Sequence, residues 1–149
     1  MTIFADLWGN LPFRCALLSW CVAQVLKVLI SFWLDKKLDW RRIFGMGGMP
    51  SSHSAFVFSL ALAIGLLDGF SSTAFALAFA LAAVVIYDAM GVRRETGRQS
   101  EVLNQIITQM LVEGKPIDEK QLKELVGHSP IEVLGGLIVG TAVTLLMML

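Results

Sequence analysis

Four long apolar blocks constrain this chain more than any other feature of its sequence. Each block approaches the ~20 residues that a helix needs to cross the hydrocarbon core of a bilayer. The two middle blocks are short, and they can still span if the bilayer thins locally or if neighbouring helices shield their ends. The blocks are residues 15–34, 52–67, 73–89 and 131–149. They predict an all-α fold, a polytopic membrane helical bundle with about four transmembrane helices.

The composition argues against an ordinary soluble domain. Of the 149 residues, 56% are hydrophobic and 16% are charged, whereas soluble domains carry ~25% charged residues. The formal net charge is zero, so no nucleic-acid partner is expected. A lone Arg14 precedes the first block and no small-residue cleavage site follows it, so we expect this span to be retained and not removed as a signal peptide. We expect one membrane-embedded domain over residues 1–149.

The basic residues predict an orientation. With four crossings, segments 35–51 and 91–130 emerge on the same side of the membrane, whereas the termini and the short turn 68–72 lie on the other. Because basic loops stay in the cytoplasm, we expect an integral cell-membrane protein with cytoplasmic loops and both termini outside. Ten of the twelve basic residues lie in the two loops: Lys36, Lys37, Arg41, Arg42, Arg93, Arg94, Arg98, Lys115, Lys120 and Lys123.

The second loop contains its own helical pattern. From residue 98 to 114 one helical face is apolar, and Gly114 can end the helix. A helix lying at the membrane interface or covering a site fits this pattern, and so does a helix packed on the spans with no role in access. The apolar face consists of Val102, Leu103, Ile106, Ile107, Met110 and Leu111.

The segment GMGGMPSSHSA, residues 45–55, predicts a capped helix start directly before the second span. Pro50 ends the preceding structure, and Ser51 or Ser52 can cap the helix. Free N–H groups and the positive end of the helix dipole suit a phosphate, with His53 in the first turn. The alternative is a well-capped span whose histidine lies at the interface and has no chemical role.

The segment GHSPIEVLGGLIVG, residues 127–140, predicts a second capped start at the last span. Ser129 is the expected N-cap, Pro130 the first helical residue and Glu132 the third, which makes a capping box. This cap is a sufficient structural reason for Glu132. It does not explain His128, which the topology places on the same membrane face as His53.

The segment 87–100 adds charge at the end of the third span. A carboxylate in an apolar helix is costly, so Asp88 is a candidate functional or ion-pairing residue. Arg93 and Arg94 follow, and arginine binds phosphate oxygens with a bidentate fork. Basic residues at such a helix end also serve as ordinary topology signals.

Together these segments resemble a known family. PSSHSA (50–55) looks like the P-S-G-H motif of type 2 phosphatidic acid phosphatases, with Ser52 in place of the glycine. GHSPIEVLGGLIVG (127–140) resembles the H-x-x-x-D-V-x-x-G end of that superfamily's last motif. With QVLK (24–27) and YDAMGVRRETGRQSEVLN (87–104), most of the chain is similar to the divergent PAP2 family, which is related to acid phosphatases and vanadium-dependent haloperoxidases.

The resemblance implies a metal-independent lipid phosphate phosphatase that forms a phosphohistidine and needs no cofactor. His128 would attack phosphorus, Glu132 would orient its imidazole in place of the usual aspartate, and His53 would protonate the leaving alkoxide. The helix start would stabilise the equatorial oxygens together with arginine. The phosphate-binding residues would be Ser51, Ser52, Arg93, Lys27 and Arg42, with Asp88 in a supporting role.

Two features depart from the superfamily pattern. Arg93 and His128 are separated by 34 residues, 94–127, whereas the superfamily motif holds its arginine a few residues before the histidine. The superfamily's first motif, K-x-x-x-x-x-x-R-P, has no complete match in this chain. The cations that take its place are either Lys27 with Arg41 or Arg42, or one of Lys36 and Lys37.

Two classes of function therefore compete. The first is hydrolysis of a lipid phosphomonoester at the cytoplasmic headgroup level, with membrane lipids as the other partners. The alternative is a non-enzymatic membrane scaffold or small-solute carrier with a decayed PAP2-like site. A third alternative is a vanadate-dependent oxidase, against which the motif departures and the membrane embedding argue. Four small residues allow close helix contacts, within one chain or in a homo-oligomer: Ala78, Ala82, Gly136 and Gly140.

Overall fold

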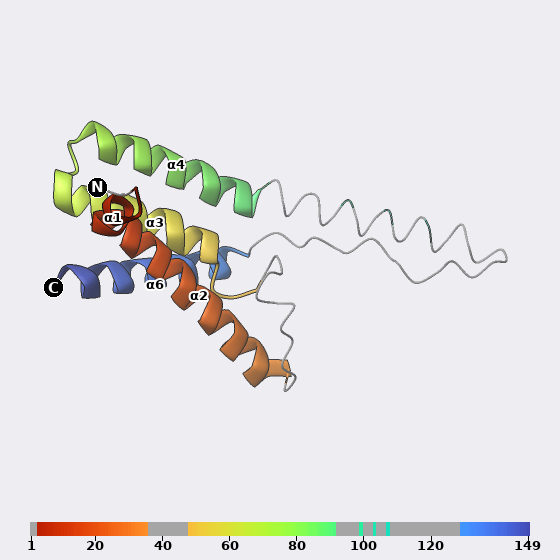
Figure 1. Ribbon diagram of the computed structural model, residues 1–149. Coiled ribbons are helices and arrows are strands. Elements are labelled where there is room, and N and C mark those ends of the chain that lie inside the picture. The colour runs from red at the N-terminus through yellow and green to blue at the C-terminus, as the bar shows by residue number, and fades with distance from the viewer. Residues whose placement is uncertain (1–2, 36–47, 92–98, 100–102, 104–106, 108–128) are drawn as a thin grey trace.

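The computed structural model describes residues 3–35, 48–91, 99, 103, 107 and 129–149. These residues form five helices, which Figure 1 labels. They are α1 (Ile3–Gly9), α2 (Leu11–Asp35), α3 (Ser52–Asp68), α4 (Thr73–Met90) and α6 (Pro130–Met148). The prediction of an all-α membrane bundle is confirmed.

Three of the helices are long and apolar enough to cross a membrane, in the segments Leu11–Trp33, Thr73–Met90 and Pro130–Met148. The fourth, α3, is an apolar helix of 17 residues. It is one of the two blocks that the sequence marked as short, whereas the other, in α4, proves long enough to span. Three full-length spans plus this shorter helix agree with the predicted count of about four.

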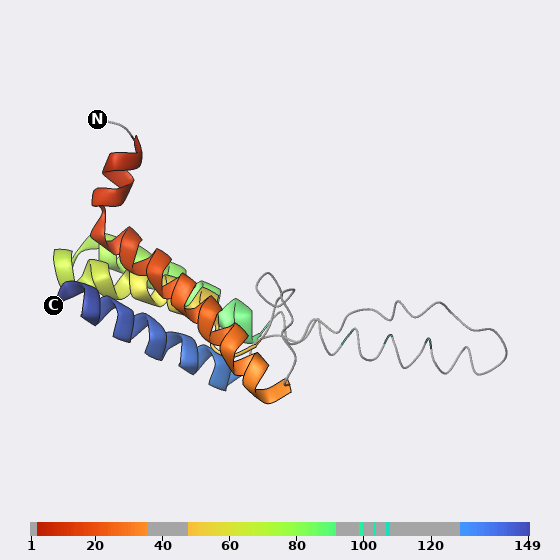
Figure 2. The ribbon, with the colours of Figure 1, turned by 60° about the horizontal axis from the view of Figure 1, so that its bottom comes forward.

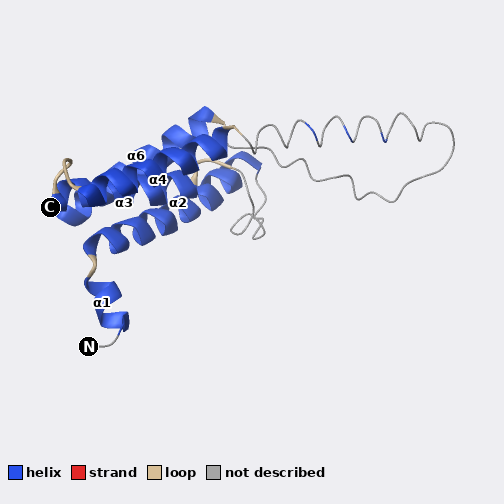
Figure 3. Ribbon diagram, turned by 90° about the horizontal axis from the view of Figure 1, so that it is seen from above, coloured by secondary structure: helices blue, strands red, loops and turns tan. Residues whose placement is uncertain are grey.

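The first span begins earlier than predicted. It starts at Leu11, and not at residue 15, because the Asn10 side chain accepts a hydrogen bond from Phe13 N at 3.0 Å and caps the helix. Before this cap lies α1, a short helix that was not predicted. Figures 2 and 3 show α1 turned away from the axis of the bundle.

Helix α3 lies at the centre of the bundle. It packs against α2, α4 and α6, and α2 also packs against α6. Within the described segments, α2 and α4 flank α3 without packing against each other. Figure 3 shows the four long helices lying side by side.

Small side chains fill the interior and large apolar ones face outward, which is typical of helices packed within a lipid bilayer. The buried side chains include Cys15, Ala23, Ala55 and Ala63. Exposed large apolar residues are spread over every long helix; they include Leu29, Leu66, Leu77, Val84, Tyr87 and Leu146. Bilayer lipid therefore suits the outer surface better than water does.

Helices α3 and α6 run parallel and approach very closely. A Cβ added at Gly140 would lie 2.9 Å from the carbonyl oxygen of Ala55, so only glycine fits at this distance. Further along, Ser59 Oγ and Thr144 Oγ1 are 2.7 Å apart. Thr144 donates its own proton to the carbonyl of Gly140 at 2.8 Å, so Ser59 is the donor between the helices.

The predicted small residues all serve contacts within one chain. Ala78 and Ala82 of α4 join Val57 and Ala61 of α3 in one buried cluster. Gly136 and Gly140 of α6 are buried against α3. These four residues therefore give no separate support to a homo-oligomer. Both cysteines are free, Cys15 buried and Cys21 exposed.

The ends of the chain agree with an even number of crossings. Figure 2 shows α1 and the end of α6 at one end of the bundle, and the start of α6 at the other end. Most of the helix predicted over residues 98–114 lies outside the described residues, and so do the basic residues of both loops. The described residues of that segment, Gln99, Leu103 and Ile107, are helical.

Candidate functional site

A turn at residues 48–50 and a serine N-cap form the start of α3. Gly48 adopts φ +93°, a conformation that favours glycine, and Pro50 follows a cis peptide bond. Ser51 is the N-cap: its Oγ accepts hydrogen bonds from Ser54 N at 3.4 Å and from Ser54 Oγ at 3.0 Å. The predicted cap is confirmed at Ser51. Ser51 and Ser52 are both buried.

The start of α6 carries the predicted capping box. Ser129 Oγ accepts a hydrogen bond from Glu132 N at 3.3 Å, and Glu132 Oε2 accepts one from Ser129 N at 3.0 Å. Pro130 is the first helical residue. One carboxylate oxygen of Glu132, Oε2, therefore accepts the hydrogen bond of the helix cap.

The two helix starts are joined directly. The N–H of Ser51 donates to the carbonyl oxygen of Glu132 at 2.9 Å. One turn later, Gly136 touches the backbone of α3: its added Cβ would overlap the carbonyl oxygen of Ser51 and lie 2.9 Å from Ser54 Cβ. The positive ends of two parallel helix dipoles therefore lie side by side at one end of the bundle.

Lys27 lies close to this pair. Lys27 belongs to a helix long enough to span the membrane, and it is only 3% exposed because it lies inside the bundle. A Cβ added at Gly48 would lie 3.4 Å from Lys27 Cγ, so the lysine stem passes against the turn before α3. Glu132 lies within electrostatic range of the Lys27 ammonium. A buried lysine and a carboxylate residue thus flank the two helix starts.

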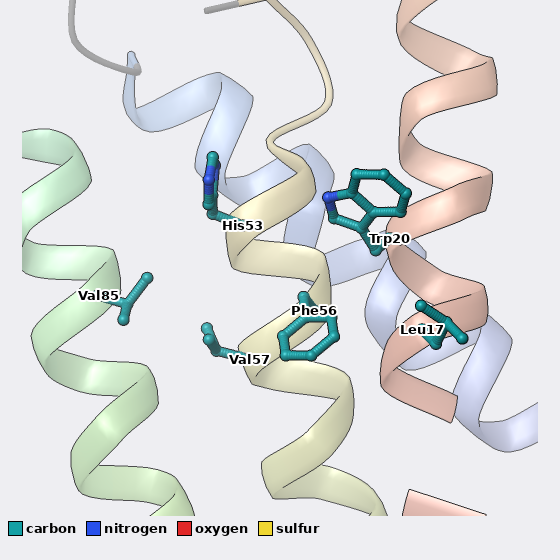
Figure 4. Close-up of a pocket in the computed structure, with 6 residues that line it drawn as sticks. All are labelled: Leu17, Trp20, His53, Phe56, Val57 and Val85. Carbon is teal, nitrogen blue, oxygen red and sulfur yellow. The ribbon is translucent and has the colours of Figure 1, made fainter. Parts of the chain in front are cut away.

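His53 is exposed in the first turn of α3 and lies at the end of an apolar groove. Figure 4 shows the groove crossing α3 between α2 and α4. Its volume is about 440 Å³, and its other lining residues are Leu17, Trp20, Phe56, Val57 and Val85. Neither composition nor motif analysis pointed to this groove, because it forms where two helices that do not pack together both rest on α3.

The structure brings together only some of the predicted site residues. Lys27, Ser51, Ser52 and Glu132 meet at the joined starts of α3 and α6, with His53 one residue further along α3. Asp88 is half-buried in the last turn of α4. His128, Arg42 and Arg93 lie outside the described residues, as do the alternative cations Arg41, Lys36 and Lys37.

Metal binding has no candidate among the residues whose placement is described. In these segments no three His, Cys, Asp or Glu side chains lie close enough together to hold an ion.

Comparison with known proteins identifies the family. The sequence pattern of the divergent PAP2 family matches residues 8–143. The chain belongs to the divergent PAP2 family. It is also 39% identical over 152 residues to the uncharacterized membrane protein YuiD of Bacillus subtilis (strain 168), covering 95% of this chain and 96% of that protein. No solved structure matches the chain.

Family membership agrees with the order of segments on which the resemblance was based. The matched region includes every long helix except the last residues of α6. Both comparisons support a PAP2-related membrane protein, and the name of the relative assigns no reaction.

Proposed function

We propose that this membrane protein is a phosphatase that hydrolyses a lipid phosphomonoester through a phosphohistidine at His128. The observation that carries the proposal is the hydrogen bond between Ser51 and Glu132, which holds the starts of two parallel helices together. His128 directly precedes Ser129, the N-cap of the second of these helices. His53 lies in the first turn of the other.

This arrangement suits a doubly charged phosphate. Each helix N-terminus carries roughly half a positive charge, and its first N–H groups point out of the helix. The amine of Lys27, beside the turn that precedes α3, adds positive charge when it is protonated. In this proposal Arg93 and a second loop cation, such as Arg42, bind the phosphate oxygens and neutralise the remaining negative charge of the phosphate.

The proposed chemistry proceeds in two displacements. His128 attacks phosphorus and the bond from phosphorus to the lipid oxygen breaks, while His53 gives a proton to the departing alkoxide. Neutral His53 then takes a proton from water, which attacks the phosphohistidine and releases inorganic phosphate and free His128. Protons and charge balance over the cycle, and no metal ion or other cofactor takes part.

Glu132 has one carboxylate oxygen in the helix cap. Its second oxygen is the one that would accept the His128 N–H and fix the tautomer in which the other ring nitrogen attacks. The same side chain thus links the cap of α6 to the orientation of the residue that precedes it. Asp88 plays a supporting, charge-balancing part in this proposal.

A specific observation favours the second candidate, a membrane scaffold or small-solute carrier. Three of the proposed phosphate-binding side chains, those of Lys27, Ser51 and Ser52, are at most 3% exposed. In a protein that binds no phosphate, they would serve only to cap α3 and to seal the bundle. The phosphatase requires instead that the backbone N–H groups and the loop arginines make the direct contacts.

Phosphate release from the purified protein separates these two functions. The assay compares a panel of lipid phosphomonoesters, each with and without a chelator, and uses His128→Ala purified in parallel to measure contaminating activity. The phosphatase proposal predicts chelator-resistant release by the wild type alone. Release that is the same in His128→Ala, or none with any lipid phosphate, favours the scaffold or carrier.

A further inference from the structure

We propose that the groove on α3, between α2 and α4, binds one hydrocarbon chain of the lipid phosphate. This inference rests on the proposed function for the identity of the headgroup. The groove itself is a feature of the described helices, and the binding of a chain in it can be measured without any turnover.

The groove is lined by three helices and has the volume of a binding site. Phe56 and Val57 of α3 form its floor, Leu17 and Trp20 line it from α2, and Val85 lines it from α4 (Figure 4). Its volume of about 440 Å³ lies within the roughly 300–1,000 Å³ of small-molecule sites. The gap persists because α2 and α4, as described, rest on α3 without touching.

The position of His53 indicates what fills the groove. All other lining residues are hydrophobic, and His53 is the lining residue nearest the start of α3. The site therefore offers an imidazole at the end where the helix starts meet and apolar walls along the rest. An amphiphile with a phosphate at one end and a hydrocarbon chain behind it matches both parts. A water-soluble phosphate would leave the apolar part empty.

The surroundings of the groove limit what it contributes. The flanking helices α2 and α4 are both long and apolar enough to span, so a chain enters the groove from bilayer hydrocarbon and not from water. Burying it gains no hydrophobic free energy, because lipid tails are as apolar as the groove walls. The gain is one of fit and direction: the chain aligns the ester oxygen with His53.

Trp20 provides a direct measure of occupancy. In a variant with Trp8, Trp33 and Trp40 replaced by phenylalanine, Trp20 is the remaining tryptophan, and a bromine on the lipid chain quenches it on contact. The measurement uses vesicles of unbrominated phosphatidylcholine with increasing chain-brominated phosphatidic acid, in the His128→Ala background so that the lipid is not consumed. Chain-brominated phosphatidylcholine at the same mole fractions is the control for bulk lipid.

The proposal predicts saturable quenching by the phosphate lipid that excess unbrominated phosphatidic acid reverses, and weaker, unsaturable quenching by phosphatidylcholine. Val85→Phe, which fills the groove, should abolish the saturable part. Val84→Phe is the matched control, because Val84, next to Val85 on α4, is 67% exposed and does not line the groove. Equal quenching by both lipids, or saturable quenching that survives Val85→Phe, overturns the proposal.

A second pair of variants tests the groove from its opposite wall by activity. The readout is the ratio of turnover on a long-chain lipid phosphate to turnover on a short-chain phosphomonoester. Leu17→Phe should lower this ratio by about tenfold or more, as a lost fit to a hydrocarbon group does. Leu18→Phe, next to it and 44% exposed outside the groove, should leave the ratio close to that of the wild type.

The two assays separate the failure of each proposal. If the wild type hydrolyses neither substrate, the phosphatase function fails, and the Trp20 quenching still decides whether the groove holds a chain. If it hydrolyses both substrates and the ratio is the same in Leu17→Phe and Leu18→Phe, the groove is not the chain site although the phosphatase stands. If Val85→Phe does not fold, the Leu17 pair is measured by quenching with the same expected contrast.

Discussion

The backbone N–H of Ser51 donates to the carbonyl oxygen of Glu132 at 2.9 Å, so the first residues of α3 and α6 are fixed to each other without any side chain between them. The contact depends on Gly136, where an added Cβ would overlap the Ser51 carbonyl. Substitutions that separate these two helix starts should therefore affect both stability and any chemistry that both helices share.

The first prediction concerns this close contact. Gly136→Ala should destabilise the protein by about 1–3 kcal/mol, because the methyl group meets backbone that cannot move aside without shifting a helix. Gly135→Ala is the control, since its Cβ would meet Pro50 Cβ at 3.3 Å and the flexible end of Met49 at 3.4 Å. Thermal unfolding in detergent micelles compares the two variants. Equal stability would show that the helices are not in contact at Gly136.

The second prediction separates the two roles of Glu132. Glu132→Gln should keep the cap, because the amide oxygen can still accept the Ser129 N–H, and its loss of turnover should be smaller than that of His128→Ala. Ser129→Ala removes the serine half of the cap at a cost of about 0.5–2 kcal/mol and keeps the carboxylate charge. Phosphate release and thermal unfolding are measured for both variants. If Ser129→Ala loses more turnover than Glu132→Gln, Glu132 acts through the cap alone.

The local signals in the sequence predicted the helix starts well. Ser129, Pro130 and Glu132 form the expected capping box because a cap depends only on residues within one turn. The apolar blocks likewise located the spans, apart from the first. That span begins at Leu11, ahead of the apolar block counted from Cys15, because Asn10 caps the helix before Arg14.

Features that depend on helix packing were not accessible in the same way. The burial of Lys27 follows from how α2 lies against Gly48, a contact between residues of different segments. The groove beside His53 depends on the separation of α2 and α4, which no motif encodes. The burial of Ser51 and Ser52 could not be predicted from the sequence either, because the motif indicates a helix cap and does not indicate which helices cover it.

The third prediction assigns His53 as the general acid. His53→Ala should lower turnover of an alkyl lipid phosphate by about 10²–10⁴, the usual contribution of proton transfer. The loss should be much smaller with a nitrophenyl ester, whose leaving oxygen needs little protonation. Phosphate release from both substrates is compared in the wild type and the variant. An equal loss on both would argue against the acid role.

The fourth prediction concerns orientation, which follows from the ten basic residues in the two loops. A reporter that is active only in the cytoplasm should be silent when it is fused after Leu149. The same reporter inserted into the loop 91–130 should be active and serves as the control. A strong signal from the Leu149 fusion would reverse the topology and move the site to the outer face.

The most direct test of the phosphatase account is to trap the phosphorylated protein. Rapid quenching with a lipid phosphate carrying labelled phosphorus should give a protein-bound phosphoryl group that is stable to base and labile to acid, as a phosphohistidine is. The account predicts that this label lies on His128 and is absent in His128→Ala. A wild-type protein that releases phosphate with its label on another residue, or that acquires no label while turning over, would contradict it.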